Sequence, residues 1–413
     1  MSEPRTLSPW RERQEGWAVP IDRVDAFTSG AAMAVEVGAI EKELAALWRQ
    51  AAERARTAGG ELAVLRAALW NFIVHHVGEA GLAELKALLD EASRAVPARI
   101  IVLLEQHAEA ESLWGTAEPL RAFVEATLRL GPDGRREVVA EEITLEARVM
   151  EMGRLPALVR SLLLPDLPMA ALVRAAPACA RLAPLLAEAD RIIFDSGRGG
   201  PEPLGPMERL LRTPHPAGGT LAERAEVTDL GWMRTASWRR IIASMFEGAA
   251  VARLGALDEV RVRYAAGAAP AAHLLLGWLA TRLGWHLPGL ALGPEGGELR
   301  DAGGRPLRIR LEVDEDHWRG DASPGPRPLG GLVAVELRAG TECFHAGAVG
   351  DHCVEVRCPG RPLRREVIRD RTDAELLIGA LGAFGRDPLM RQALGAALQL
   401  LGVAMEDELP GQA

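Results

Sequence analysis

A glycine- and proline-rich segment near the middle of the chain limits most strongly what this sequence can fold into. Residues Gly197 to Gly219 read GRGGPEPLGPMERLLRTPHPAGG. Because proline lacks a backbone donor and glycine weakens regular structure, we expect only one short turn there, around Met207 to Leu211. The segment predicts two domains separated by a linker. The predicted division is a polar N-terminal tail at 1–30, an N-terminal α/β domain at 31–196, the linker at 197–219 and a C-terminal α+β domain at 220–405.

The sequence before this segment alternates between helix and strand patterns. Apolar residues recur three and four positions apart between Ala34 and Ala55, which is typical of an amphipathic helix. The unbroken apolar run Ile100 to Leu104 predicts a central strand, buried on both faces. Alternation on both sides of Pro132-Asp133-Gly134 predicts an antiparallel hairpin. With strands at 68–77, 168–173 and 191–195 and helices at 82–92, 155–163 and 180–189, this half is predicted to be a layered α/β domain with a mixed sheet.

The sequence after the segment combines the same elements in a different order. Trp238, Ile241 and Met245 lie on one stripe of a predicted helix, and a second helix, His273 to Leu283, is stopped by Gly284. Apolar residues alternate with charged ones from 307 to 313, which is typical of a half-buried strand. Further strands are expected at 332–337, 342–345 and 353–357, and further helices at 373–381 and 388–400. This half is therefore predicted to be α+β.

Charge and hydrophobicity narrow the classes of function. The formal net charge of the 413 residues is −9 and no long basic run occurs, so nucleic acid is not an expected partner. Residues Met1 to Val19 lack the apolar core of a secretory signal, and no apolar run is long enough to span a bilayer. We expect a cytoplasmic protein that does not bind a membrane. Its four cysteines are expected to be reduced thiols, because no CxxC occurs.

The search for catalytic and cofactor motifs finds one weak candidate. The only glycine cluster that we find after a predicted strand is DSGRGG at 195–200, and prolines follow where a nucleotide-binding helix would have to begin. Carboxyl ends of strands are nevertheless where α/β sheets bind ligands. Asp195, Ser196 and Arg198 therefore form an alternative hypothesis, a site for a phosphorylated sugar or a nucleotide in an enzyme or a sensor. A polar strand end that caps the sheet is the simpler interpretation.

Two places in the sequence offer candidate metal ligands. His75 and His76 are adjacent in a predicted strand, so their side chains point to opposite faces and cannot share one ion. Cys343, His345 and Cys353 could meet across a hairpin, but no fourth ligand is evident, and buried cysteine often serves as a small apolar residue. We expect no metal, no cofactor and no catalytic residues.

Six sequence blocks stand out along the chain: PARIIVL at 97–103, SLLLPDLP at 161–168, ADRIIFDS at 189–196, VTDLGWMR at 227–234, SWR at 237–239 and HLLLGWLATRLGW at 273–285. They resemble blocks of the OpcA family of glucose-6-phosphate dehydrogenase assembly proteins. The resemblance keeps the order of the family and spans roughly residues 40 to 290. One departure is that the family often carries paired tryptophans after PDLP, where this chain has Ala171-Leu172-Val173-Arg174. A surface formed by those aromatic residues would be missing here.

The resemblance implies a non-catalytic protein that helps glucose-6-phosphate dehydrogenase to assemble or to become active in the oxidative pentose phosphate pathway. Tryptophan and arginine are enriched at interface hot spots. We therefore expect Trp232, which precedes a predicted helix, to be exposed and to bind the partner together with Arg234 and Arg239. Trp238 and Trp278 are expected to pack in the core.

Overall fold

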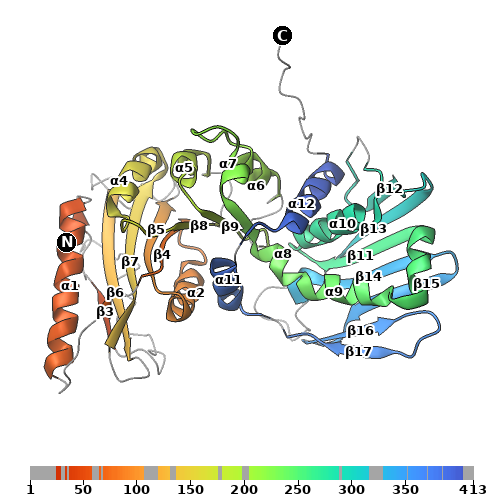
Figure 1. Ribbon diagram of the computed structural model, residues 1–413, viewed down its shortest axis with the longest axis horizontal. Helices are drawn as coiled ribbons and strands as arrows, with labels where there is room; N and C mark the ends of the chain where they lie inside the picture. Colours follow the sequence, from red (N-terminus) through yellow and green to blue (C-terminus); the bar gives the residue numbers. More distant parts are fainter. Residues whose placement is uncertain are drawn as a thin grey trace, which may run out of the picture. The chain divides into compact units, whose positions relative to one another are not determined.

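The structure is a computed structural model, and its chain forms two compact units (Figure 1). The first comprises residues 1–192 and 215–217, and the second comprises residues 193–214 and 218–413. The residues that the structure describes are 25–28, 33–34, 37–57, 65–66, 68–106, 120–130, 136–174, 179–197, 204–287, 291–315, 329–350, 352–369, 371–383 and 385–402.

A mixed sheet forms the centre of the first unit. Its strand order is β1-β6-β7-β5-β4-β8-β9, and the chain passes into the second unit within β9. Strands β7, β5, β4 and β8 run parallel to one another, whereas β6 runs antiparallel to β7. The strands are β1 (Asp25–Thr28), β4 (Trp70–Val77), β5 (Ala98–Gln106), β6 (Leu120–Leu130), β7 (Arg136–Arg148), β8 (Met169–Val173) and β9 (Arg191–Phe194), with short β2 (Met33–Ala34) beside β6 and β3 (Leu65–Arg66) beside β7.

The central strand and the hairpin predicted from the sequence are confirmed. β5 lies between β7 and β4, and every one of its residues is buried, as expected for an apolar strand between two layers. In the hairpin, Val124 pairs with Ile143, and the register shifts between Thr127 and Leu128. The predicted Pro132-Asp133-Gly134 turn lies outside the described residues.

Helices cover both faces of this sheet. The buried guanidinium of Arg99 donates to Glu141 of β7, to Glu41 of α1 (Val37–Thr57) and to the Leu162 carbonyl of α4 (Leu155–Leu162), so α1 and α4 share one face. Lys86 of α2 (Leu82–Ala95) pairs with Glu142, the neighbour of Glu141 in the strand, which places α2 on the opposite face. Helix α5 (Cys179–Leu186) connects β8 to β9. The predicted layered α/β fold class is confirmed.

The segment that follows the PDLP block is an interior strand. Ala171 and Leu172 belong to β8, all of whose residues are buried beside β4. These positions therefore form no surface in this chain.

A second sheet forms the core of the second unit. Its strand order is β12-β13-β11-β14-β15-β16-β17, in which β11 and β13 are parallel and every other neighbouring pair is antiparallel. The strands are β11 (Glu259–Ala265), β12 (Gly296–Arg300), β13 (Pro306–Asp314), β14 (Leu332–Ala339), β15 (Glu342–Ala348), β16 (Cys353–Arg357) and β17 (Arg364–Val367).

Three helices pack on one face of this sheet. α9 (Ala236–Met245), α10 (Ala269–Leu283) and α12 (Pro388–Leu400) share one apolar core with Val260, Val262 and Val335. α10 and α12 approach closely at Gly277, where an added Cβ would lie 2.1 Å from the Ala393 carbonyl oxygen. α11 (Asp373–Gly382) begins at a capping box, and Gly284 ends α10 with φ 66°, as predicted.

The structure differs from the sequence-based expectations at several elements. β11 was not predicted, although Val260, Val262 and Tyr264 alternate with charged residues along it. Strands β10 (Glu226–Asp229), β12 and β17 and the short helices α7 (Leu221–Arg224) and α8 (Leu230–Arg234) were not predicted either. Helix α6 (Leu204–Leu211) lies inside the predicted linker, and it belongs to the second unit. The linker bounds at 197–219 stay a prediction.

Replacing the tryptophan at the centre of the second core should destabilise the fold strongly. Trp238 is fully buried, so Trp238→Ala removes a large side chain from a closely packed interior and is expected to cost about 3–5 kcal/mol of unfolding free energy. Urea denaturation followed by tryptophan fluorescence and circular dichroism measures this. Trp278→Ala is the control, because Trp278 is only partly buried and should cost less. Equal costs for the two variants would contradict the assignment of Trp238 to the core.

Candidate functional site

One buried carboxylate anchors the turn that follows β9. The backbone N–H of Ser196 donates to Asp229 Oδ1 at 2.9 Å, and its hydroxyl donates to Oδ2 at 2.7 Å. Oδ2 also accepts the backbone N–H of Trp232 at 2.8 Å, so Asp229 is the N-cap of α8. Complete burial raises the pKa of the Asp229 carboxyl above its usual value, while these three hydrogen bonds act against the rise.

Gly231 allows this close contact between α8 and the turn. An added Cβ at Gly231 would lie 2.2 Å from the Ser196 hydroxyl oxygen and 3.0 Å from Asp229 Oδ2. No real Cβ atom tolerates the first of these distances, so only glycine fits between the carboxylate and the serine.

Arg234 at the end of α8 joins two further acidic residues. Its Nη1 donates to Asp195 Oδ1 at 2.5 Å, and its Nη2 donates to Asp195 Oδ2 at 3.3 Å and to Asp373 Oδ1 at 2.8 Å. Burial by itself lowers the pKa of Arg234, but the two carboxylates outweigh it and hold the pKa above its ordinary value. Arg234 therefore connects the turn after β9 to the first turn of α11.

Trp232 and Arg239 form the third part of the cluster. The indole N–H of Trp232 donates to Asp387 Oδ2 at 2.9 Å, and Asp387 is the N-cap of α12. The Arg239 guanidinium lies over the indole, 3.3 Å from the ring centroid, and its Nη1 donates to the Trp232 carbonyl and the Thr235 hydroxyl. Burial lowers the pKa of Arg239 to about 10, and nearby Asp387 opposes this shift.

These contacts define the α8 cluster, which lies within the second unit. It brings together five of the six predicted site residues from both hypotheses and adds Asp229, Thr235, Asp373 and Asp387, which the sequence analysis missed. Asp387 could have been found as the residue before Pro388, which is a helix-start signal. The predicted residues in the cluster are Asp195, Ser196, Trp232, Arg234 and Arg239.

Trp232 and Arg198 complete the set of predicted site residues. Trp232 was predicted to be exposed, and this is wrong: it retains 4% of its accessible surface, because its ring is covered by Arg239 and its N–H is bonded to Asp387. Arg198 lies outside the described residues.

The polar side chains of the α8 cluster form hydrogen bonds with one another. Both oxygens of Asp195 accept from Arg234, and the Ser196 hydroxyl donates to Asp229. A ligand at this strand end would have to replace charge-assisted hydrogen bonds within the protein. The arrangement positions five chain segments, namely the turn after β9, α8 and the N-terminal turns of α9, α11 and α12.

A second polar group lies at the carboxyl ends of parallel strands in the first unit. β4 connects through α2 to β5 on one side, and β8 connects through α5 to β9 on the other, which makes the β4–β8 boundary a topological switch point. His75 Nε2 lies 3.2 Å from Glu105 Oε2, and Gln106 donates to Glu146 at 2.5 Å. Burial raises the pKa of Glu146, although Gln106 opposes the rise.

The two adjacent histidines have separate environments, as their strand positions predict. His75 faces Glu105, whereas His76 Nε2 lies 2.9 Å from the Ala80 carbonyl oxygen in the loop before α2. Burial and the charge of Arg174 lower the pKa of His76 to about 4, so it is neutral at physiological pH.

Two of the four cysteines, Cys343 and Cys353, lie on the second sheet, whereas Cys358 follows β16 and Cys179 begins α5. Cys343 pairs with Arg338 on β14, and Cys353 pairs with Val367 on β17. Burial raises the pKa of the Cys343 and Cys358 thiols, which lowers their thiolate fraction. In the part of the chain that the structure describes, no group of three or more His, Cys, Asp or Glu could hold a metal ion. Nor does any described helix have the length and apolar character to cross a membrane.

Two models of one protein family match the chain in sequence order. The model described as the glucose-6-phosphate dehydrogenase subunit N-terminal domain matches residues 89–212, and the model of the C-terminal domain of that subunit matches residues 225–394. Together they cover most of the chain. The chain belongs to the OpcA family. The resemblance of its sequence blocks to that family is thereby confirmed.

Curated OpcA proteins of cyanobacteria are similar to this chain over part of their length. An OxPP cycle protein OpcA of Synechocystis sp. is 25% identical over 284 residues, which are 64% of this chain and 56% of the relative. That of Synechococcus elongatus is 27% identical over 272 residues, which are 62% and 58%. The matches thus span little more than half of the relatives' own length.

Solved structures of oxidoreductases resemble the chain only distantly. An oxidoreductase from Sinorhizobium meliloti has a TM-score of 0.44 at 13% identity, covering 82% of this chain and 96% of its own. Scyllo-inositol dehydrogenase from Lactobacillus casei has a TM-score of 0.39 at 9% identity, covering 82% and 96%. Likenesses of this size carry no argument about chemistry.

Removing the buried carboxylate should destabilise the second unit more than removing its serine partner. Asp229→Ala leaves two backbone donors and one hydroxyl unsatisfied and is expected to cost about 3 kcal/mol or more, whereas Ser196→Ala removes one donor and should cost about 1 kcal/mol. Urea denaturation of both variants measures the difference. If the two variants were equally stable, Asp229 would not anchor the α8 cluster.

His76 should make stability depend on pH in the acidic range. Its folded-state pKa of about 4 lies below the ordinary 6.5, so between these values the unfolded chain binds a proton that the folded chain does not. Stability is therefore lost as the pH falls, by up to about 2 kcal/mol between pH 7.5 and 5.0. Melting across this range should show a smaller loss for His76→Gln, which keeps a donor for the Ala80 carbonyl. Parallel curves for the two proteins would refute this.

Proposed function

We propose that this chain is a non-catalytic, cytoplasmic partner that promotes assembly and activity of glucose-6-phosphate dehydrogenase in the oxidative pentose phosphate pathway. The observation that carries the proposal is the ordered match of the N- and C-terminal domains of a glucose-6-phosphate dehydrogenase subunit family. The cyanobacterial relatives, which are named after the OxPP cycle, support the same pathway.

The α8 cluster supports a non-catalytic role. The Ser196 hydroxyl, which lies next to the Asp229 carboxylate, is buried and donates its hydrogen bond to that carboxylate. Asp195 is neutralised by Arg234, which is itself shared with Asp373. The alternative hypothesis of a sugar-phosphate or nucleotide site at Asp195, Ser196 and Arg198 stays a prediction. The hydrogen bonds of Asp195 to Arg234 and of Ser196 to Asp229 argue against it, because a ligand would have to displace them.

The decisive experiment combines this chain with glucose-6-phosphate dehydrogenase from its own organism. The purified chain alone should show no dehydrogenase activity, yet it should raise the enzyme's rate or shift its oligomeric state in a saturable way. Because a partner that binds the folded enzyme stabilises it by mass action, the enzyme's melting midpoint should rise with the concentration of the chain. Steady-state kinetics, size-exclusion chromatography and thermal melting measure the three effects.

Two controls keep the result specific. An unrelated acidic protein at the same mass concentration should leave rate, assembly and melting unchanged. Trp238→Ala, which disrupts the second core, should lose the effect in proportion to its unfolded fraction. No change in any of the three measurements at saturating wild-type chain would show that the proposed function is wrong.

A further inference from the structure

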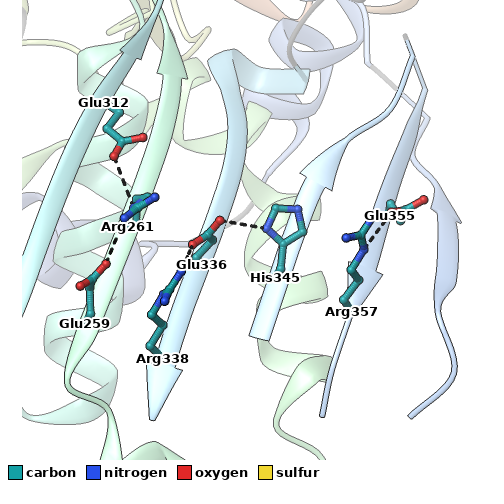
Figure 2. A network of polar contacts seen from close by, with 8 residues as sticks. All are labelled: Glu259, Arg261, Glu312, Glu336, Arg338, His345, Glu355 and Arg357. Carbon is teal, nitrogen blue, oxygen red and sulfur yellow. Dashed lines mark hydrogen bonds and ion pairs between the residues drawn. The ribbon is translucent and has the colours of Figure 1, made fainter. Parts of the chain in front are cut away.

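The described helices α9, α10 and α12 pack on one face of the seven-stranded sheet, and charged side chains line the opposite face, several of which Figure 2 shows. Along β11, Val260 and Val262 point into the core with α9 and α10, so the alternating residues Glu259, Arg261 and Arg263 point to the opposite face. The pairing of strands continues this face across the sheet. Its members include Glu312, Glu336, Arg338, His345, Glu355 and Arg357.

Ion pairs hold these side chains in place. Arg261 lies 3.4 Å from Glu259 and 3.3 Å from Glu312. On the next strands Glu336 lies 3.3 Å from Arg338 and 3.5 Å from His345, as Figure 2 shows. The charged groups therefore occupy defined positions before any partner arrives, which reduces the side-chain entropy lost on binding.

The positive groups extend further into solvent than the negative ones. The exposed fractions of the carboxylate side chains are 11% for Glu355, 15% for Glu259 and 21% for Glu336, and Glu312 is an exception at 41%. The corresponding fractions for arginines are 45% for Arg338, 66% for Arg357 and 64% for Arg365, and Arg261 is an exception at 26%.

This difference gives the face a positive outer layer on a chain whose net charge is −9. Glu355 is one example. Arg357 and Arg365, which are more exposed than Glu355, both pair with its carboxylate and lower the pKa of its carboxyl. Each of these arginines keeps donors directed to solvent, because a guanidinium has five N–H groups and the carboxylate accepts only some of them.

We propose that this charged sheet face, centred on Arg338, Arg357 and Arg365, docks an acidic surface of the partner protein. The inference rests on the proposed function, in which the partner is glucose-6-phosphate dehydrogenase, and it adds the surface and its chemistry. Carboxylates of the partner replace solvent around the exposed guanidiniums, where bidentate pairing gives both orientation and affinity.

A protein partner fits this face better than a nucleic acid does. Glu312 is exposed between the arginines, and Glu259 and Glu336 lie just beneath them. A phosphate backbone would be repelled by these carboxylates, whereas a protein surface can place its own positive or polar groups opposite them.

The test is a charge reversal at Arg357 and Arg365, two strongly exposed arginines of the face. Arg357→Glu combined with Arg365→Glu should weaken binding to glucose-6-phosphate dehydrogenase by roughly a hundredfold, and the double change to Gln by roughly tenfold. The Gln variant should melt near the wild-type temperature, because its amides can still donate to Glu355, and it is the folded reference for the binding measurement. The Glu variant should melt lower, because it places two further carboxylates beside the largely buried Glu355. Wild-type binding should weaken as salt rises from 50 to about 300 mM.

A matched control reverses two exposed arginines elsewhere in the same unit. Arg240 on α9 and Arg282 on α10 belong to helices that pack on the other face of the sheet, so Arg240→Glu with Arg282→Glu changes the net charge equally and should leave binding near wild type. Biolayer interferometry gives the dissociation constants, and the enzyme's rate gives the activation.

The outcomes separate this inference from the proposed function. If the wild-type chain activates the enzyme and the variants at Arg357 and Arg365 bind it equally well, the docking face is wrong while the function stands. If the wild-type chain neither binds nor activates the enzyme, the proposed function is wrong, and so is the partner assigned to this face. If duplex DNA or heparin binds the wild-type chain at 150 mM salt and the reversal abolishes that binding, the face serves a polyanion instead.

Discussion

The second unit depends on the satisfaction of a single buried carboxylate. Asp229 has no access to water, so its oxygens need donors from the protein, and they receive them from Ser196 and from the first turn of α8. This requirement brings the turn after β9 against α8, where only Gly231 leaves enough room. Once α8 is placed, Arg234 reaches α11 and Trp232 reaches α12.

Buried charge has a similar role in the first unit, with a different geometry. Arg99 on the central strand β5 is satisfied by Glu141 on β7, by Glu41 on α1 and by a carbonyl of α4. An unpaired guanidinium at this buried position would destabilise the fold strongly. The contacts of Arg99 therefore fix α1 and α4 in position against the sheet. The charges on the open face of the second sheet differ, because they are paired and yet remain accessible to solvent. The buried ion pairs position helices and strands, whereas the ion pairs of the open sheet face are accessible to the proposed partner.

Much of the fold could be predicted from patterns that act over a few residues. The apolar run in β5 indicated a central strand, because a strand buried on both faces needs apolar residues at successive positions. The alternation in β6 and β7 indicated a hairpin, because a strand buried on one face needs them at every second position. β11 was missed although Val260, Val262 and Tyr264 alternate with the two arginines between them, because the strand is short. For the site, the blocks around 195–196 and 232–239 were selected correctly as one family signature. That they form one cluster could not be predicted from spacing.

The fold class, the family, the central strands and the burial of Trp238 could be predicted from the residues alone, because each depends on local periodicity or on a contiguous block of residues. The burial of Trp232 and the neutralisation of Arg234 became visible only in the folded chain. Their partners, Asp387 and Asp373, stand 155 and 139 residues further along the chain, and no local pattern encodes such a contact. The positive outer layer of the open sheet face was likewise decided by tertiary structure. Strands that are distant in sequence pair side by side there, and the longer arginine side chains extend past the glutamates beneath them.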